Sequence, residues 1–196
     1  MNKLRNSRII ITGGAGLVGS HTCDMLIEEQ PKEIIIIDNF SRGKIENLKD
    51  ALNSGIVKII KGDIRDNRII DRAFRDVDYC FHLAAIRITE CAQYPQKCIE
   101  TMVGGTFNVL KACINKKIKK IVFASSASIY GMADKFPTLE SHHPYNNRTL
   151  YGAVKTFNEQ LLRVFSEMYG LKYVALRYFN VYGERQNYAD PYRNVL

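Results

Sequence analysis

The chain has 196 residues, of which 46% are hydrophobic and 24% are charged, so it can bury the core of one globular domain and the start of a second. Basic residues outnumber acidic ones by 28 to 20, and the formal net charge of +8 is compatible with a nucleic-acid partner or with anionic small molecules. No apolar run approaches the roughly 18 residues of a membrane span, and the first residues lack the apolar stretch of a secretion signal, so we expect a cytoplasmic protein without a membrane partner.

The first part of the chain alternates between strand-like and helix-like segments. Residues 8–12 (RIIIT) are apolar on both faces of a strand, which is typical of a central parallel strand, and a glycine cluster ends them. A helical pattern follows over 17–28, with Pro31 just beyond its end. The next predicted elements are a strand over 33–38, a polar helix over 44–53 and a strand over 56–60.

The same rhythm continues to residue 178. The predicted elements there are a short helix over 67–74, a strand over 78–83, a long helix over 95–115, a strand over 120–125, a helix over 150–169 and a strand over 172–178. Gly170 is placed to end the last helix. Strands that alternate with helices form right-handed βαβ units and a parallel sheet covered on both faces. We therefore predict a doubly wound α/β fold of the Rossmann type, with strand order 3-2-1-4-5-6.

A glycine-rich segment joins the first strand to the first helix. Gly14, Gly16 and Gly19 match the pattern G-x-G-x-x-G, and Gly13, Gly16 and Gly19 match G-x-x-G-x-x-G. Glycine allows a tight turn there and lets the backbone approach a pyrophosphate, while the start of the helix offers free N–H groups and partial positive charge. Because a strand precedes the motif and a helix follows it, the motif predicts a dinucleotide site.

Asp38 ends the second predicted strand, 19 residues beyond Gly19. A carboxylate at this place hydrogen-bonds a ribose 2′-hydroxyl and repels a 2′-phosphate, so the sequence favours NAD over NADP. Arg42, four residues further on, could instead meet a 2′-phosphate.

Tyr151 and Lys155 stand at i and i+4, on one face of the helix over 150–169. A phenol is a poor base at neutral pH because its ordinary pKa is about 10, but a nearby ammonium lowers that pKa, so the pair can take and return an alcohol proton. Ser125, Ser126 and Ser128 follow the fifth strand at the edge where open α/β sheets bind ligands. Their hydroxyls could hold the same substrate oxygen, or could cap a helix or a turn.

Several short motifs occur together in one order. They are the glycine stretch over 13–19, Ile37-Asp38-Asn39, Gly62-Asp63-Ile64, His82-Leu83-Ala84-Ala85, SSASIYG over 125–131, Tyr151-x-x-x-Lys155 and Arg177-Tyr178-Phe179-Asn180. Over essentially the whole chain they resemble the extended short-chain dehydrogenases/reductases of the NAD-dependent epimerase/dehydratase family, and most of all its nucleotide-sugar 4-epimerases. The resemblance implies NAD as cofactor and a UDP-hexose as substrate.

The resemblance also implies roles for the matching positions. Ser126, Tyr151 and Lys155 would be catalytic, and Ser126, Ser128 and Asn180 would contact the substrate. The cofactor-binding residues would be Gly13, Gly16, Leu17, Val18, Asp38, Asn39, Ser41, Arg42, Asp63, Ile64, Leu83, Ala84, Ala85, Arg87, Tyr151, Lys155 and Tyr178. By this likeness the tyrosinate removes the O4 proton of the sugar while the C4 hydride passes to NAD, which is regenerated in each cycle.

The chain departs from the family pattern at two places. Family members commonly have an asparagine three residues before the Gly-Thr pair that Gly105-Thr106 matches, whereas this chain has Met102, which puts a polar relay from that helix in doubt. The chain also stops where the family's substrate-binding portion begins. We therefore expect an NAD-binding domain over 1–180 and the start of a truncated substrate-binding region over 181–196.

Other functions stay open on the sequence alone. A nucleotide-sugar dehydratase would need an acidic pair where this chain has Ala127-Ser128, a ketoreductase would consume NADH, and non-catalytic NAD-binding relatives typically lose the tyrosine or the lysine. The densest basic run, residues 116–120, has no interleaved aromatic residues, so nucleic-acid binding is not expected. Apolar stripes on the helices over 95–115 and 150–169 predict a homodimer.

The five cysteines are expected to be small buried residues. Their odd number and the lack of a C-x-x-C pair predict neither a metal site nor a disulfide framework. They are Cys23, Cys80, Cys91, Cys98 and Cys113.

Overall fold

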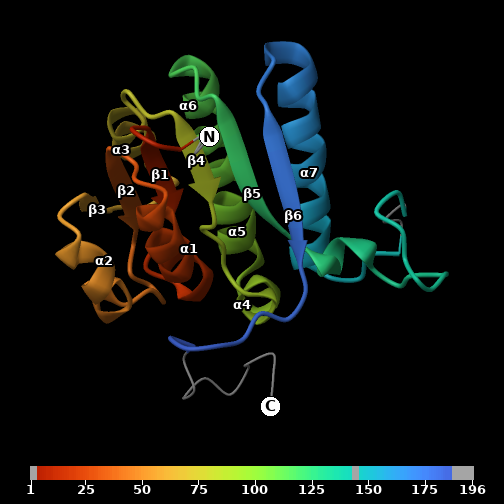
Figure 1. Cartoon of the computed structure of the whole chain (residues 1–196). Helices are drawn as coiled ribbons and strands as arrows, with labels where there is room; N and C mark the ends of the chain where they lie inside the picture. Colours follow the sequence, from red (N-terminus) through yellow and green to blue (C-terminus); the bar gives the residue numbers. More distant parts are fainter. Residues whose placement is uncertain (1–3, 143–145, 187–196) are drawn as a thin grey trace.

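The computed structural model describes residues 4–142 and 146–186, and its centre is a twisted parallel sheet between helices (Figure 1). The strands are β1 (Arg8–Thr12), β2 (Glu33–Asp38), β3 (Val57–Lys61), β4 (Tyr79–His82), β5 (Lys120–Ser126) and β6 (Tyr173–Tyr178). The helices are α1 (Leu17–Glu28), α2 (Lys49–Asn53), α3 (Asn67–Ala73), α4 (Ile88–Gln93), α5 (Pro95–Cys98), α6 (Thr106–Asn115) and α7 (Leu150–Tyr169). Short 3-10 turns span Ile45–Leu48 and Ala127–Tyr130, and a π-helical segment spans Ile99–Gly105.

The strand order is β3-β2-β1-β4-β5-β6, all parallel, which confirms the predicted doubly wound sheet. Alternate residues of β1 face opposite layers, as the two-residue period of a strand requires. Ile9 and Ile11 pack with residues of α1 and α2, whereas Ile10 packs with residues of α3, α6 and α7. Every residue of β2 is buried because helices cover both of its faces.

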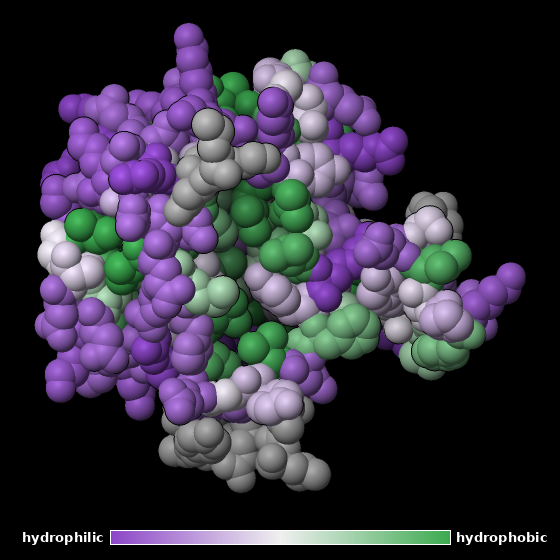
Figure 2. Space-filling view, viewed as in Figure 1, coloured by the Kyte–Doolittle hydropathy of each residue, from purple (hydrophilic) through white to green (hydrophobic). Residues whose placement is uncertain are grey.

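The edge strand β6 is less well covered than the strands at the centre of the sheet. Tyr173 and Ala175 of β6 pack on the core under α7, but Val174 and Leu176, which point to the other face, are each 39% exposed. A green apolar area lies over this part of the sheet in the space-filling view (Figure 2). The apolar alternation of β6 therefore has a partner layer on one face only, within the part of the chain that the structure describes.

The helical bounds follow the prediction closely in some places and depart from it in others. α7 begins at Leu150 and ends at Tyr169, with Gly170 in the left-handed conformation (φ +71°), as predicted. The polar helix over 44–53 begins as a 3-10 turn. The long helix from Pro95 is interrupted by the π-helical segment, and the sequence reading missed α4. The π-helical segment and α4 both pack against α7, a contact that the hydrophobic period does not reveal.

The cysteines correct one expectation. Cys91 of α4 and Cys98 of α5 form a disulfide, although the sequence predicted none. The break between α4 and α5 at Tyr94 turns two residues seven positions apart toward one another. Cys23, Cys80 and Cys113 are free and buried, as expected.

Two lysines of the basic run over 116–120 form ion pairs with nearby aspartates. Lys116 and Lys119, in the basic run after α6, pair with Asp71 and Asp78 at 2.7 Å. None of the described helices is long and apolar enough to cross a membrane.

Candidate active site

The glycine turn after β1 packs so closely that side chains are excluded. Gly13 has φ +72°, and a Cβ there would lie 2.7 Å from the backbone of Ala84. A Cβ on Gly19 would lie 2.3 Å from the carbonyl oxygen of Gly13. α1 begins at Leu17 after Gly16, and no side chain caps it. Its first N–H groups are therefore available to an anion, as the motif predicts.

Asp38 ties the end of β2 to this turn. Its Oδ2 accepts a hydrogen bond from the backbone N of Ala15 at 2.9 Å, and its Oδ1 accepts one from the backbone N of Phe40 at 2.8 Å. The residue is 8% exposed. Because each carboxylate oxygen has a second lone pair, Asp38 can still accept hydrogen bonds from ribose hydroxyls. The backbone contacts fix its position beforehand.

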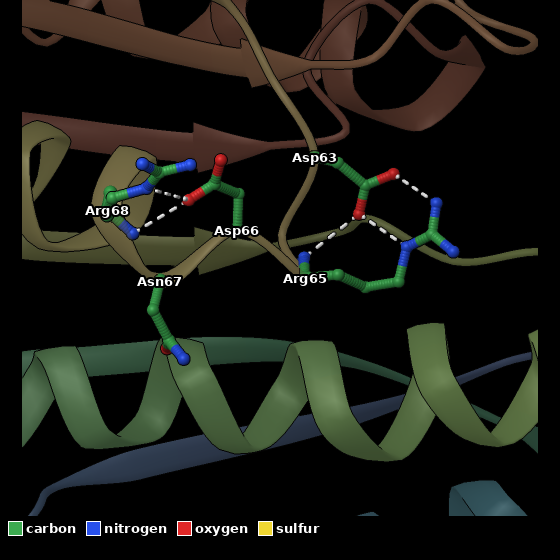
Figure 3. A pocket seen from close by; sticks show the side chains of 5 residues that line it. All are labelled: Asp63, Arg65, Asp66, Asn67 and Arg68. Atoms are coloured by element: carbon green, nitrogen blue, oxygen red, sulfur yellow. Dashed lines mark hydrogen bonds and ion pairs between the residues drawn. The ribbon is translucent and has the colours of Figure 1, made fainter.

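Asp63 lies beyond the next strand, at the edge of an open hollow lined also by Arg65, Asp66, Asn67 and Arg68 (Figure 3). Arg65 donates to Asp63 from Nε, Nη2 and the backbone N, each at 2.9 Å, and Asn39 donates from Nδ2 at 3.0 Å. These hydrogen bonds, those of Arg65 first, lower the pKa of Asp63 to about 2. The loops after β2 and β3 are thereby joined at the predicted adenine end.

Ile64, the other residue predicted to contact the adenine, is mostly buried. Its side chain is 5% exposed and packs in the core, where a Cβ on Gly105 would lie 2.6 Å from its Cδ1. Little of the side chain is left for a ligand, so any contact with an adenine must come from its backbone.

Arg42, in the loop after β2, and Arg87, just before α4, influence one another's charge. Burial lowers the pKa of Arg87, and the positive charge of Arg42 lowers it further. Burial also lowers the pKa of Arg42, whereas Glu90 opposes that effect. An anion placed beside both guanidinium groups would relieve their repulsion. Arg42 is thus near enough to Arg87 for the two positive charges to influence one another.

Ser126 and Tyr151 meet at the carboxyl end of β5. The pKa of Tyr151 is raised by burial, and a side-chain hydrogen bond to Ser126 partly opposes the rise. Ser126 Oγ also accepts from the backbone N of Ser128 at 3.1 Å, so it caps the turn over Ala127–Tyr130. Capping this turn is therefore compatible with a position of Ser126 beside Tyr151.

Lys155 is 2% exposed beneath this pair. Its Nζ donates to the carbonyl oxygen of Ala124 at 2.5 Å and lies 5.7 Å from the centre of the Tyr151 ring. Burial lowers the pKa of Lys155 to about 8, and the carboxylate of Glu159 opposes that fall. The sequence predicted that the ammonium lowers the pKa of Tyr151. In this structure burial is the largest cause at the phenol, and the pKa of Tyr151 is raised.

Ser125, one residue earlier, turns into the protein and not toward the tyrosine. Its hydroxyl donates to Oε1 of Glu159, and Arg177 donates to the same carboxylate from Nη2 at 2.8 Å and from Nε at 3.1 Å. Arg177 also donates from Nη1 to the carbonyl oxygen of Glu140 at 2.7 Å and lies 4.9 Å over the ring of Tyr130. This network ties β5, β6, α7 and the loop before α7 together.

The sequence reading did not single out Glu159 or Arg177 as a pair. A signal was available, since Tyr151, Lys155 and Glu159 follow one another at four-residue steps on one helical face. Nothing in that spacing says that Arg177, 18 residues later in β6, is the partner.

His82 is a second buried group that the sequence reading left without a role. Its Nδ1 lies 2.6 Å from Oγ1 of Thr12, and its Nε2 lies 3.1 Å from Oγ1 of Thr106. Burial first, and then the charge of Lys155, lower the pKa of His82 to about 3. A neutral imidazole therefore links β1, β4 and α6 beneath the crevice.

The remaining predicted residues lie along the same carboxyl edge of the sheet. Leu17 and Val18 begin α1, Asn39 and Ser41 follow β2, Leu83, Ala84 and Ala85 follow β4, and Tyr178 and Asn180 lie at the end of β6 and just after it. Tyr178 pairs with Ser126 in the sheet register. Among the described residues, no group of three or more His, Cys, Asp or Glu side chains gathers as metal ligands do.

Comparisons with known proteins agree with this geometry. Residues 9–196 match the model of the NAD dependent epimerase/dehydratase family. A UDP-glucose 4-epimerase of Halalkalibacterium halodurans is 38% identical over 93% of this chain and 52% of its own length. A UDP-glucuronic acid decarboxylase of Arabidopsis thaliana is 33% identical over 94% of this chain and 54% of its own length. The chain thus spans about half the length of the curated relatives it matches.

Solved structures are similar over the same region. A UDP-N-acetylglucosamine 4-epimerase from Methanobrevibacter ruminantium, in complex with UDP-N-acetylmuramic acid, superposes with a TM-score of 0.91 at 39% identity, over 97% of this chain and 60% of that one. A UDP-glucose 4-epimerase from Thermotoga maritima, with UDP-glucose, superposes with a TM-score of 0.85 at 38% identity, over 94% of this chain and 58% of that one.

Proposed function

The chain belongs to the NAD dependent epimerase/dehydratase family, and from this premise we propose that it binds NAD and takes part in the epimerisation of a nucleotide sugar. The substrate we propose is a UDP-hexose, inverted at C4. The UDP-glucose 4-epimerase relative and the two UDP-sugar 4-epimerase structures are 38% to 39% identical to this chain, against 33% for the UDP-glucuronic acid decarboxylase, which supports this choice.

The crevice fits the proposed cofactor. The glycine turn offers backbone N–H groups to a diphosphate, and Asp38 offers carboxylate oxygens to the hydroxyls of an unphosphorylated ribose. Arg42 and Arg87 add positive charge on the side of α4. When bound, NAD would supply a hydride acceptor that returns the hydride to the same carbon.

One observation carries the catalytic part of the proposal: Lys155 Nζ lies 5.7 Å from the centre of the Tyr151 ring and donates to the carbonyl oxygen of Ala124, in the strand that ends at Ser126. Tyr151 would accept the proton of the sugar hydroxyl and give it back. The hydroxyl of Ser126 would hold the same oxygen in place. Lys155 would favour the ionised phenol through its charge and would pass a proton to or from it.

The substrate side of the proposal rests on fewer contacts. Ser128 and Asn180 would touch the sugar nucleotide, as the family resemblance implies. We assign residues 1–180 to an NAD-binding domain and 181–196 to the beginning of the substrate-binding part, of which only residues 181–186 are among those described. The relatives' greater length agrees with this division.

A homodimer through α6, α7 and the π-helical segment is also part of the proposal. Phe107 and Phe157 are 46% and 49% exposed and border an apolar hollow, which Val103 and Leu161 also line. Large exposed aromatic side chains around one hollow are typical of a protein interface. Sedimentation at micromolar concentration should give twice the chain mass, and Phe157→Ser should shift it toward the monomer. A monomeric mass of the unaltered protein would reject the dimer.

The cofactor assignment has a direct test. Mass spectrometry of the purified, denatured protein should detect co-released NAD, because a catalyst that regenerates its cofactor can hold it tightly. NADP in place of NAD would contradict the role given to Asp38. If the protein releases no dinucleotide and also fails to quench NADH fluorescence on titration, the proposed function is wrong.

A further inference from the structure

The π-helical segment Ile99–Gly105 leaves its backbone open to a side chain from another helix. In a π-helical turn a backbone N–H bonds to the carbonyl oxygen five residues earlier, and not four as in an α-helix. Such turns mark places where the regular helical hydrogen bonds are rearranged. Met102, inside this segment, is 2% exposed. Its carbonyl oxygen accepts a hydrogen bond from Nδ2 of Asn158, in α7, at 2.8 Å. The interruption of the long helix is therefore joined to the helix that carries Tyr151 and Lys155.

Met102 also has a second contact, through its side chain. Its Sδ accepts from the backbone N of Ile86 at 3.3 Å. Ile86 is 8% exposed and stands between Ala85 and Arg87, both proposed to line the dinucleotide. One residue thus touches the catalytic helix with its backbone and the cofactor-lining segment with its side chain.

Asn158 shares a helical face with the catalytic pair. It lies seven residues after Tyr151 and three after Lys155, so the three side chains leave α7 in nearly the same direction. Val154, on the same face, packs with Met102 and Ile86 in one buried cluster, and Tyr151 packs against that cluster. A displacement of this face would move the phenol and the ammonium together.

The side-chain amide of Asn158 uses its nitrogen but not its oxygen in a hydrogen bond to the described residues. The residue is 0% exposed, and its Oδ1 has no hydrogen-bond partner among the residues that the structure describes. A buried acceptor without a partner costs stability, whereas an apolar side chain of the same size would not incur that cost. Packing alone therefore does not account for an asparagine at this position, and its one strong contact, to Met102, is what it contributes.

We propose that Asn158 is a positioning residue: by binding the carbonyl oxygen of Met102 it holds α7 in register with the π-helical segment and, through Met102, with the segment 84–87. This inference rests on the proposed function, because the catalytic role of Lys155 and the dinucleotide beside segment 84–87 are both part of that proposal.

The test compares two asparagines that each donate to a backbone carbonyl. Asn158→Leu removes the bond to Met102, and the matched control Asn108→Leu removes the bonds from Nδ2 of Asn108 to the carbonyl oxygens of Ile64 and Arg65 at 3.1 and 3.2 Å. Lys155 is followed in the free protein by NMR of 13C-labelled lysine across pH 6 to 11. NADH affinity is followed separately by fluorescence.

Asn158→Leu should raise the pKa of Lys155 from about 8 toward the ordinary lysine value by roughly one unit, because water reaches an ammonium whose helix is no longer held. It should also weaken NADH binding about tenfold. Asn108→Leu should lower the melting temperature without moving the Lys155 titration. The inference is wrong if Asn158→Leu lowers only the melting temperature. Asn158→Ala makes the same comparison if the leucine variant does not fold.

Met102→Leu separates the two contacts. It keeps the carbonyl oxygen that Asn158 binds and removes the sulfur acceptor for Ile86, with little change in volume. NADH affinity should fall several-fold while the Lys155 titration stays in place. An unchanged affinity would remove the link to segment 84–87. If the unaltered protein did not bind NADH, the proposed function would fail, yet the Lys155 titration would still decide the role of Asn158.

Discussion

The two halves of the sheet are built on different principles. In the half formed by β1, β2 and β3, consecutive isoleucines fill both layers, and every residue of β2 is buried. In the half formed by β4, β5 and β6, one face of β6 is open, and the interior contains polar and ionisable groups such as His82, Lys155 and Asn158. The first half is filled mainly by apolar side chains, with the buried carboxylates Glu33 and Asp38 at the ends of β2, whereas the second half buries polar groups near the proposed reaction site.

This contrast indicates where each half is vulnerable. The half formed by β1, β2 and β3, here called the dinucleotide half because it contains the glycine turn, depends on the fit of the backbone at that turn. Steric changes should therefore weaken its proposed binding of the cofactor most. The catalytic half depends on pairing of charges and hydrogen bonds, so changes that remove one polar group should harm it most. The predictions below follow from this difference, beginning with the largest expected effect.

Tyr151→Phe tests the catalytic half without disturbing its packing. It removes only the phenol oxygen, so turnover of UDP-glucose to UDP-galactose, measured by NMR in the protein joined to its substrate-binding part, should fall by about 10³-fold. NADH affinity should stay within about threefold. Turnover that survived the loss of the phenol would remove Tyr151 from the reaction.

Gly19→Ala tests the dinucleotide half by steric means. The added Cβ would lie 2.3 Å from the carbonyl oxygen of Gly13, so the turn must open, and NADH affinity should fall about 100-fold. Gly104→Ala is the matched control, because a Cβ at that helical glycine meets nothing within 4 Å. Fluorescence titration of NADH checks both variants. Equal affinities in the two would contradict the role of the turn.

Much of the first half could be predicted from the sequence, because its signals are local. The isoleucine runs and the glycine spacing indicate the strands and the turn, and the acidic residue Asp38 marks the end of β2, all within one βαβ unit. α7 was equally clear, since its apolar stripe is long and Gly170 ends it. Each of these depends on residues near one another in the chain.

What the sequence did not reveal depends on contacts between distant segments. Glu159 meets Ser125 across 34 positions, and Asn158 meets Met102 across 56. The π-helical winding and the raised pKa of Tyr151 are consequences of burial, which follows only from the assembled fold. The motifs were enough to propose catalytic residues, but they did not reveal the groups that hold those residues in place.

Glu159→Gln tests that supporting network. The side chains of Arg177 and Glu159 are 22% and 15% exposed, and removing the carboxylate charge leaves the guanidinium half-buried without its counter-charge. The free energy of unfolding in urea should fall by about 2 kcal/mol. The pKa of Lys155 should also fall, because Glu159 raises it.

Glu167→Gln is the control for that variant. Glu167 pairs with Arg163 one turn away on the same helix, but both side chains are about two-thirds exposed. Its removal should leave the urea midpoint unchanged, because exposed pairs contribute little. If both glutamine variants unfolded alike, the Glu159–Arg177 pair would have no special role.

Asp63→Asn should have the smallest effect on stability and a defined pH window. The pKa of Asp63 is about 2 in the folded protein, below the ordinary 3.8, so its contribution is complete above pH 3.8 and is lost as the pH falls toward 2. The side chain is partly exposed, so the difference from the unaltered protein should be about 1 kcal/mol or less at pH 6 and should vanish near pH 2. Urea unfolding at the two pH values checks this, and a pH-independent difference would contradict it.

A crystal structure of the protein grown with NAD would test most directly that the two halves serve one crevice. We predict a diphosphate on the N–H groups at the start of α1, ribose hydroxyls on Asp38, and a nicotinamide ring beside the hydroxyl of Tyr151. A dinucleotide bound elsewhere, or a Tyr151 hydroxyl turned away from the nicotinamide, would contradict it.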